Sequence, residues 1–404
     1  SDVCSSDLRH FGITIPKKKT FQVNPMPALF DWPYIPRELE APLSAPGPAG
    51  RAEVIIGPRQ VGKSTMLQKL VEGRRHIILT GEDEDDLAIL SDPKSYLKLT
   101  EEYPYLIIDE AQFIPGIGRV IKRIVDNNRS GSRIFVTGSS SLDLAGGLKE
   151  SAAGRFNSYE LWPFSLRELA RRTSWIEVKR SMNERLIYGS MPAVVNDPRH
   201  AEEYLLDISD AVLYKDIFKL AEMRRPAEFT KLVKYLALNI GSVVRYGTMA
   251  SELGIQNKTI ERYIDLLEAC CILRVVPSLS RNPQSEIKLG KKIYFYDNGI
   301  RNALIRKFSP LPARTDSGAL WENLFFTERL KLHAFRRDGT EIFFWRTRAQ
   351  HEMDFLEVQN GKVAAFECKS SPKTKTTSIR AFERAYPDTP VTIATPGNVD
   401  ELFD

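Results

Sequence analysis

Short apolar runs alternate with longer amphipathic stretches between about residues 51 and 165. Four of the runs have the length and β-branched content of buried strands, namely Ala52–Ile56, His76–Thr80, Tyr105–Asp109 and Arg133–Thr137. The stretches between them have the length of helices. Strands that alternate with helices form a parallel sheet covered by helices. This part of the chain is therefore predicted to be an α/β domain.

The pattern changes after residue 165. Residues 166–227 are predicted to be helical and to form a lid over the nucleotide. Residues 228–290 contain two helical segments joined through Gly254, which is the spacing of a helix-turn-helix. Two short β-like runs, Ile272–Val276 and Lys292–Tyr296, could then form the wing of a winged helix.

Composition limits the classes of protein to which this chain can belong. The chain has 404 residues and 42% hydrophobic content, enough for two or three domains with apolar cores. Its net charge of +5 permits nucleic-acid binding without demanding it, because 57 basic residues face 52 acidic ones. Residues 1–50 hold eight of the 24 prolines and are predicted to be a partly ordered arm.

The cysteines and the apolar runs indicate in which compartment of the cell the protein resides. The four cysteines include no C-x-x-C pair, so neither a zinc site nor a disulfide framework is indicated. No apolar run approaches the roughly 18 residues that a membrane span needs. We therefore expect a cytoplasmic protein with no membrane partner.

A phosphate-binding loop follows the first predicted strand and precedes a predicted helix. It matches G-x-x-x-x-G-K-[ST] throughout, with Gly57, Pro58, Arg59, Gln60, Val61, Gly62, Lys63, Ser64 and Thr65. Backbone N–H groups in such a loop, with the helix N-terminus behind them, surround anionic oxygens. The motif predicts ATP as the ligand, with Lys63 on the β and γ phosphates and Ser64 on Mg²⁺.

Two carboxylates end the third predicted strand, about 45 residues after Ser64. An apolar strand followed by Asp109 and Glu110 has the form of a Walker B element. We expect Asp109 to hold Mg²⁺ through water. Glu110 is expected to orient and deprotonate the water that attacks the γ-phosphate.

Small hydroxyl residues and one arginine follow the fourth predicted strand. Ser139 or Ser140 could sense the γ-phosphate from the carboxyl edge of the sheet, and a turn or helix-cap role is an equal alternative. Arg155 precedes an extended run, Phe156–Leu161. It could reach the ATP of a neighbouring subunit, or form a salt bridge with Glu160 or another local acid.

Three polar residues lie at the front of the second helix of the predicted helix-turn-helix, where a DNA-reading helix carries its contacts. They are Lys258, Thr259 and Arg262, and they are expected to face outward while Ile260, Ile264 and Leu267 face the core. DNA contact and a structural or partner-binding role are evenly matched, because one lysine and one arginine are ordinary surface residues.

The C-terminal part contains a predicted hairpin. Asn360-Gly361 is a strong two-residue turn signal, and such a turn pairs residues whose numbers add up to 721. Asp354 then lies opposite Glu367, and Glu352 lies opposite Lys369. These four residues share one face, and the other face is apolar, with Met353, Phe355, Phe366 and Cys368.

Facing carboxylates repel each other unless a cation neutralises them. The spacing of Asp354, Glu367 and Lys369 is that of the PD-(D/E)xK nuclease core, and Glu322 on a preceding helix could supply a third acid. Glu322, Asp354 and Glu367 would then hold a second Mg²⁺, with Lys369 assisting the attacking hydroxide. In the alternative, Lys369, Arg346 and Arg348 neutralise the acids without a metal.

These motifs together resemble the prokaryotic AAA-type ATPases that carry a C-terminal domain of unknown function, over about residues 30–400. The resemblance rests on Gly57–Thr65, Leu106–Gln112, Val136–Ser141, Gly154-Arg155, Trp162–Ser165, Tyr188–Val195, Lys292–Gly299, Trp321–Asn323, Glu352–Phe355 and Glu367–Lys369. It implies an arginine-finger role for Arg155 and assembly into a ring, with a hexamer favoured.

The expected fold class is α/β, with an AAA+-like P-loop parallel sheet and helical lid, then a winged helix-turn-helix and an α/β restriction-nuclease-like domain. The expected domains are the arm (1–50), the ATPase core (51–165), the lid (166–227), the winged helix (228–290) and the nuclease-like domain (291–404). The leading functional hypothesis is a Mg²⁺-dependent ATPase that acts as an oligomeric motor on duplex or branched DNA, including Holliday junctions. The alternatives are an ATP-gated, metal-dependent DNA nuclease and a nucleotide-dependent protein switch or toxin-like regulator.

Overall fold

The computed structural model describes residues 32–45, 47, 50–138, 154–211, 217, 225–279, 290–347, 349–369 and 377–404. Contacts divide the chain into Ser1–Tyr34 and a compact unit, Ile35–Asp404. The description that follows concerns the second unit.

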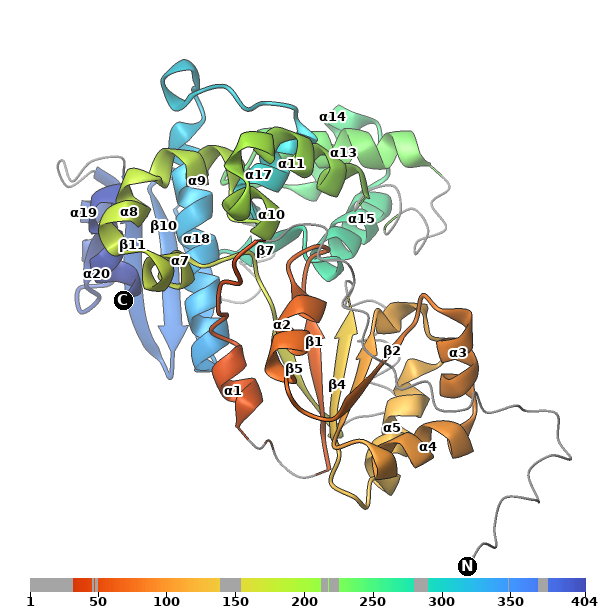
Figure 1. Ribbon diagram of the computed structural model, residues 1–404. Helices are drawn as coiled ribbons and strands as arrows, with labels where there is room; N and C mark the ends of the chain where they lie inside the picture. Colours follow the sequence, from red (N-terminus) through yellow and green to blue (C-terminus); the bar gives the residue numbers. More distant parts are fainter. Residues whose placement is uncertain are drawn as a thin grey trace, which may run out of the picture. The chain divides into compact units, whose positions relative to one another are not determined.

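A parallel five-stranded sheet forms the first layer of this unit (Figure 1). The four predicted strands are confirmed as β1 (Ala52–Ile56), β2 (His76–Thr80), β3 (Tyr105–Asp109) and β4 (Arg133–Gly138), in the order β2-β3-β4-β1-β5. The fifth strand, β5 (Phe156–Glu160), pairs with β1 at the edge of the sheet. The sequence indicated only an extended run there, because its alternation of polar and apolar residues is weak.

Helices cover both faces of this sheet. They are α2 (Lys63–Leu70), α3 (Glu84–Ser91), α4 (Pro93–Glu102) and α5 (Ile117–Asn127). Side chains alternate between the faces, so Ile55 packs with Met66 and Leu67 of α2, while Val54 packs in the cluster that contains Ile121 of α5. Both faces of β1 are therefore buried, as its unbroken apolar run predicts.

The last part of the predicted arm belongs to this compact unit. Residues 40–44 form a short helix, α1 (Glu40–Ser44). Leu39 and Leu43 are buried in the same cluster as α2, and Ile35 is buried against the C-terminal elements. The ordered chain thus begins before residue 51. Prolines in this stretch had suggested an arm, but three buried aliphatic side chains anchor it.

The described residues of the segment predicted as a lid include the α-helices α7 (Leu166–Arg172), α8 (Trp175–Arg180), α9 (Met182–Tyr188), α10 (Pro192–Asn196) and α11 (Ala201–Asp210). Both α9 and α11 pack against α17 (Asn298–Leu304), and α9 also contacts α18 (Ser317–Arg336). These helices therefore bury their apolar sides against elements that lie more than 80 residues later in the chain.

Three helices and a small antiparallel sheet follow. The helices are α13 (Pro226–Leu238), α14 (Tyr246–Leu253) and α15 (Asn257–Ala269), and the strands are β6 (Val243–Val244), β7 (Leu273–Pro277) and β8 (Lys291–Phe295), in the order β6-β8-β7. Gly254 ends α14 with φ +69°, a left-handed conformation that glycine adopts readily. The turn between α14 and α15 thus has the residue that its geometry requires.

The C-terminal sheet is mixed and four-stranded, in the order β12-β11-β10-β9. Its strands are β9 (Glu341–Arg346), β10 (Glu352–Gln359), β11 (Lys362–Cys368) and β12 (Val391–Ala394). The helix α18 covers one face and α19 (Thr377–Ala385) covers the other, and α20 (Val399–Phe403) ends the chain (Figure 1).

The predicted hairpin register is confirmed, because Phe355 pairs with Phe366 and Gln359 pairs with Lys362. One face assignment is wrong. Met353 packs with Leu356 on the α19 face, whereas Phe355 faces α18. The pairing of β10 with β9 shifts between Met353 and Leu356, and this irregularity breaks the alternation of side chains.

Candidate nucleotide site and acid cluster

The phosphate-binding loop connects β1 to α2 at the carboxyl edge of the first sheet. A Cβ atom added at Gly57 would lie 2.2 Å from the carbonyl oxygen of Leu161, so only glycine fits there. Gly62 has φ +93° and directly precedes the first residue of α2. The backbone therefore requires glycine at both positions. The loop leads directly into the N-terminus of an eight-residue helix.

Lys63 is 4% exposed, and its ammonium donates hydrogen bonds to the carbonyl oxygens of Gly57 and Pro58, at 3.0 Å each. The charge therefore lies in the curve of the loop. The residues around this curve fit a triphosphate, because an anion there would meet the ammonium and the helix N-terminus together.

The carboxylate of Asp109 accepts hydrogen bonds from the hydroxyl groups of two residues on different elements. Ser64 Oγ donates to Asp109 Oδ2 at 2.7 Å, and Thr137 Oγ1 donates to Asp109 Oδ1. Thr137 is fully buried and also accepts the backbone N–H of Glu110 at 3.3 Å. A serine and an aspartate at this spacing suit Mg²⁺, which prefers oxygen ligands.

Glu110 follows Asp109 and has φ +47°, which is uncommon for a residue with a side chain. Its carboxylate accepts a hydrogen bond from Gln112 Nε2. Strained backbone of this kind concentrates at functional sites. The conformation turns Glu110 away from the strand direction of Asp109, so the two acids are held separately.

Two residues of this site were not found from the sequence. Thr137 was recognised only as the end of a strand, while Ser139 or Ser140 was favoured, and residues 139–153 lie outside the described part of the chain. Arg37 is 5% exposed and donates to Val61 O at 2.9 Å, to Trp162 O and to Glu168 Oε1 at 3.1 Å. It fastens the loop to the segment after β5. No motif marks Arg37, since its partners are 24 to 131 residues away.

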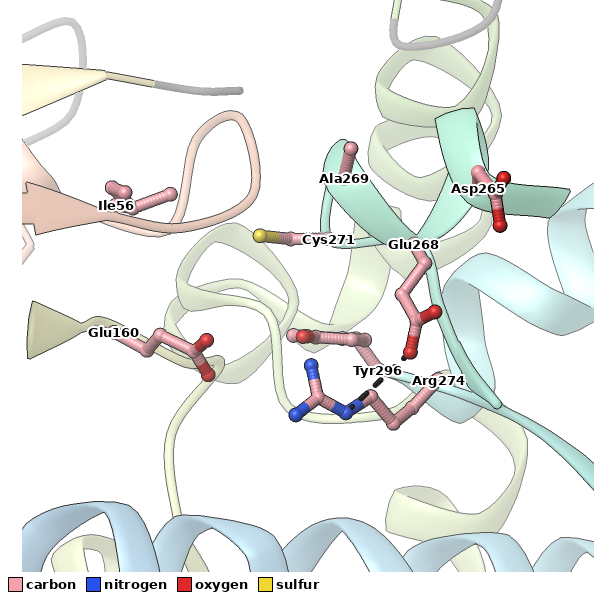
Figure 2. A pocket seen from close by; sticks show the side chains of 8 residues that line it. All are labelled: Ile56, Glu160, Asp265, Glu268, Ala269, Cys271, Arg274 and Tyr296. Carbon is pink, nitrogen blue, oxygen red and sulfur yellow. Dashed lines mark ion pairs between the residues drawn. The ribbon is translucent and has the colours of Figure 1, made fainter. Parts of the chain in front are cut away.

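A cavity of about 210 Å³ lies beside this loop (Figure 2). Ile56 and Glu160 line it from the ends of β1 and β5, and the rest of the lining comes from α15 and the strands that follow it, namely Asp265, Glu268, Ala269, Cys271, Arg274 and Tyr296. The carboxylate of Glu160 and the guanidinium of Arg274 face each other across the cavity. The carboxyl edge of the first sheet therefore meets the C-terminal end of α15.

An ion pair lies on the α15 side of this cavity, and a ring stack joins its two sides. Arg274 Nε lies 3.6 Å from Glu268 Oε1, and the ring of Trp162 stacks on Tyr296 with 4.2 Å between centroids. Burial raises the pKa of the Glu160 carboxyl above its usual range, and the Arg274 guanidinium opposes that rise.

Arg155 lies at the opposite edge of the sheet from the phosphate-binding loop. Its carbonyl accepts the N–H of Ala52, the first residue of β1, whereas the loop follows the last residue, Ile56. Its Nε lies 2.5 Å from Asp126 Oδ1, and both side chains are over one-third exposed. The ion pair is therefore with Asp126, 29 residues away in sequence, and not with Glu160, the acid named from the sequence.

The predicted DNA-contact residues lie on α15 as expected. Lys258 and Arg262 are exposed and Thr259 is half-buried, while Ile260, Ile264 and Leu267 are buried. The exposed residues are at the N-terminal end of the helix. Its C-terminal end, with Asp265 and Glu268, lines the cavity described above.

Three carboxylates meet around Lys292, and we call Glu322, Glu352 and Asp354 the acid cluster. Lys292 Nζ lies 2.8 Å from Glu322, 2.6 Å from Glu352 and 3.6 Å from Asp354. Burial alone lowers the pKa of Lys292, but Glu322 and Asp354 raise it above the usual range, so the amine carries a charge. Burial raises the pKa of Glu322 to about 7, against the effect of Lys292.

The remaining residues predicted for a second metal are close by. Lys369 Nζ lies 2.7 Å from Glu367 Oε1, and Asp354 Oδ2 accepts the N–H of Cys368 at 2.8 Å. Arg346 pairs with Glu352 at 3.4 Å, and Arg348 lies outside the described residues. Within the described ranges, no group of three or more His, Cys, Asp or Glu is placed to hold a metal ion.

The ammonium group of a lysine therefore lies where the metal ion was expected. The sequence suggested Lys369, Arg346 and Arg348 as alternatives to a metal, but the central cation is Lys292. It was missed because it was assigned to an apolar wing strand, and its carboxylate partners follow 30 or more residues later in the chain.

Comparisons with known proteins agree with this geometry. The family model described as an AAA domain matches residues 49–170. Two domains of unknown function, DUF8612 and DUF4143, match residues 179–311 and 317–400. Among the described helices, none combines the length and apolar character needed to cross a bilayer.

The similar proteins found include uncharacterized ones. An uncharacterized protein of Mycobacterium tuberculosis is 27% identical over 342 residues, which cover 83% of this chain and 74% of the relative. One of Methanocaldococcus jannaschii is 26% identical over 370 residues, covering 84% and 79%. A Walker-type ATPase structure of Pyrococcus abyssi has 15% identity, covers 67% of this chain and 94% of that chain, and gives a TM-score of 0.45.

The AAA match spans the five-stranded sheet and its phosphate-binding loop, and the two further matches follow it without overlap. Together with the arrangement of Lys63, Ser64 and Asp109, they show that the chain carries an AAA-type P-loop domain of the ATPase kind, followed by domains of unknown function.

Proposed function

We propose that the chain hydrolyses ATP with Mg²⁺ and uses the energy to act, as an oligomer, on duplex or branched DNA. The observation that carries this proposal is the position of α15. One end of this helix presents Lys258 and Arg262 to solvent, and its other end lines the cavity beside the phosphate-binding loop. A change at the nucleotide can therefore reach the exposed Lys258 and Arg262 through one helix.

The residues of the loop divide the hydrolytic work. Lys63 and the backbone N–H groups at the start of α2 would hold the phosphates, and Ser64 and Asp109 would hold Mg²⁺. When bound, the metal would neutralise charge on the phosphate oxygens. Glu110 would orient the attacking water, and Gln112 and Thr137 keep Glu110 in position through their hydrogen bonds.

The proposed DNA-binding unit is the segment from α13 to β8. Its order of helices and strands, with β6-β8-β7 antiparallel, supports a winged helix. The second helix of a helix-turn-helix pair enters the major groove with its N-terminal residues, and here those residues are Lys258, Thr259 and Arg262. Phosphate contacts from the two cations would supply affinity for any DNA sequence.

Oligomer formation is proposed from the position of Arg155. The length of β1, roughly 13 Å at about 3.3 Å per residue, separates this arginine from the loop of its own chain. A guanidinium at that edge suits the ATP of an adjacent subunit, as in a ring of six. The pair with Asp126 is half-exposed and is weak enough to exchange for a phosphate.

The test measures ATP turnover and native mass of the full chain with Mg²⁺, with no DNA and with duplex, single-stranded or four-way-junction DNA. We expect DNA to raise turnover several-fold and the mass with ATP to be a multiple of 45.9 kDa. Glu110→Gln serves as the control, because it should bind ATP and assemble without turnover. Rates that no DNA changes would refute the motor. If the native mass still differed between ATP and ADP, the result would favour a nucleotide-dependent protein switch over a motor.

A further inference from the structure

A lysine from one sheet is enclosed by carboxylates from another part of the fold. Lys292 belongs to β8 and is 1% exposed. Its carboxylate partners come from α18 and β10. Tyr294, two residues later on the same strand, donates its hydroxyl to Glu322 at 2.5 Å. Two side chains of β8 therefore point into the acid cluster.

The contacts of Lys292 leave little room for a second cation. Lys292 Nζ lies 2.8 Å from Glu322 Oε1 and 3.6 Å from Asp354 Oδ1, so the ammonium occupies the space that a cation shared by these two acids would take. Mg²⁺ needs about six oxygens at about 2.0–2.1 Å in octahedral geometry, and those oxygens would have to replace the amine. A lysine and a divalent metal therefore exclude each other in this cluster.

One neighbouring oxygen has no partner. Glu367 is 5% exposed, its Oε1 faces Lys369, and its Oε2 is buried without a hydrogen bond among the described residues. An unpaired buried carboxylate oxygen is costly, and each one in a native structure needs an explanation. Here the oxygen borders Asp354, so it lies where a metal ligand would be needed.

We propose that Lys292 is a built-in cation that closes a divalent-metal site formed by Glu322, Asp354 and Glu367. With the amine in place the cluster is an ion-paired joint between β8, α18 and β10, and it takes no divalent ion. Without the amine, the three carboxylates bind one. This inference does not depend on ATP hydrolysis, and it predicts that the intact chain does not cleave DNA through these residues.

The charge of Lys292 affects both the stability of the fold and the affinity for a metal. Removing one partner from a buried ion pair leaves the other charge uncompensated, which is strongly destabilising. Lys292→Met keeps the length and removes the charge, so three carboxylates are left facing one another. A divalent cation then restores the balance, and the variant should gain stability from the metal alone.

The experiment titrates the nucleotide-free full chain with Mn²⁺ and counts free Mn²⁺ by electron paramagnetic resonance. We expect Lys292→Met to bind one Mn²⁺ at least about ten-fold more tightly than the unchanged protein. The double variant Lys292→Met/Asp354→Asn should lose that binding. The double variant Lys292→Met/Asp109→Asn should keep that Mn²⁺ binding, which separates this site from the phosphate-binding loop. Equal binding by the unchanged chain and Lys292→Met would overturn the proposal.

A second measurement covers the case in which Lys292→Met folds poorly. We expect that variant to unfold about 10 °C lower than the unchanged chain without metal. Lys292→Met/Glu322→Gln removes one charge of each sign and should recover most of the loss. A double variant no more stable than Lys292→Met would show that Lys292 is not the counter-ion, and the proposal would fail.

Discussion

The hydroxyl of Ser64 donates a hydrogen bond to the carboxylate of Asp109 across 2.7 Å and 45 residues of sequence. It joins the first turn of α2 to the end of β3. Because β4 lies between β1 and β3, Thr137 reaches the other oxygen of the same carboxylate. The phosphate-binding loop and the acidic strand end are thus a single hydrogen-bonded group, and the predictions on catalysis begin there.

Thr137→Val should lower ATP turnover by about ten- to a hundred-fold, because small displacements of catalytic groups have large effects on rate. Valine has nearly the same shape, but it neither donates to Asp109 nor accepts the N–H of Glu110. The measurement is kcat together with the Kd for ATP, and the Kd should change little. Thr137→Ser keeps the hydroxyl and should retain most of the activity. Equal rates in the valine and serine variants would contradict this role.

Arg155→Ala should bind ATP normally and lose turnover by about a thousand-fold, the usual effect of losing an arginine finger. The decisive measurement mixes it with Lys63→Ala, which is inactive for a different reason. In mixed oligomers, an intact loop from one variant meets an intact Arg155 from the other, so turnover should return. A mixture of Lys63→Ala with Glu110→Gln is the control. Full activity of Arg155→Ala alone, or no recovery on mixing, would exclude action between subunits.

The double variant Lys258→Ala/Arg262→Ala should weaken binding to every DNA sequence and leave ATP turnover without DNA unchanged. If both residues contact phosphates, the slope of log affinity against log salt should fall by about 2. Fluorescence anisotropy at several salt concentrations measures this slope. Lys98→Ala on α4 is the matched control, since its side chain is 64% exposed and forms an ion pair with Glu102 on the same helix. A slope unaltered by the double variant would place DNA elsewhere.

Stability should fall as pH rises past the usual range of histidine, through His333. Burial lowers the pKa of this imidazole, but Glu357 and Asp338 outweigh burial and raise it above 6.5. A base whose folded pKa is raised contributes stability below its unfolded pKa and loses it as pH rises through the folded pKa. The midpoint of thermal unfolding should therefore decline between pH 6.5 and the folded value.

His333→Gln provides the comparison for this pH effect. Glutamine keeps polar contact with the two acids and does not titrate, so the decline above pH 6.5 should be smaller in the variant. Parallel curves for the two proteins would mean that another group causes the decline.

The sequence by itself determined the elements whose signals are local. Four strands of the first sheet, the phosphate-binding loop and the carboxylates after β3 follow from apolar runs, glycine positions and spacing. The register of the C-terminal hairpin follows from one turn at Asn360-Gly361, because a two-residue turn pairs the strands in one way only.

Only the tertiary structure decided which distant residues complete the sites. Arg37 binds the phosphate-binding loop and Lys292 lies in the acid cluster, yet the sequence around each residue does not reveal these partners, which are 24 and 30 residues away. Met353 faces α19 because β10 shifts its register against β9, which the sequence of β10 alone does not show.

Secondary structure depends on residues that are close in sequence, whereas ion pairs form between residues that are close only in the folded chain. Helix and strand periods and turn types depend on neighbours in sequence, so they can be read from a short stretch. A buried charge is stabilised by whichever opposite charge the fold brings near it, at any distance along the chain. The partners of Asp109, Glu322 and Arg37 therefore became known only when the strands and helices were packed together.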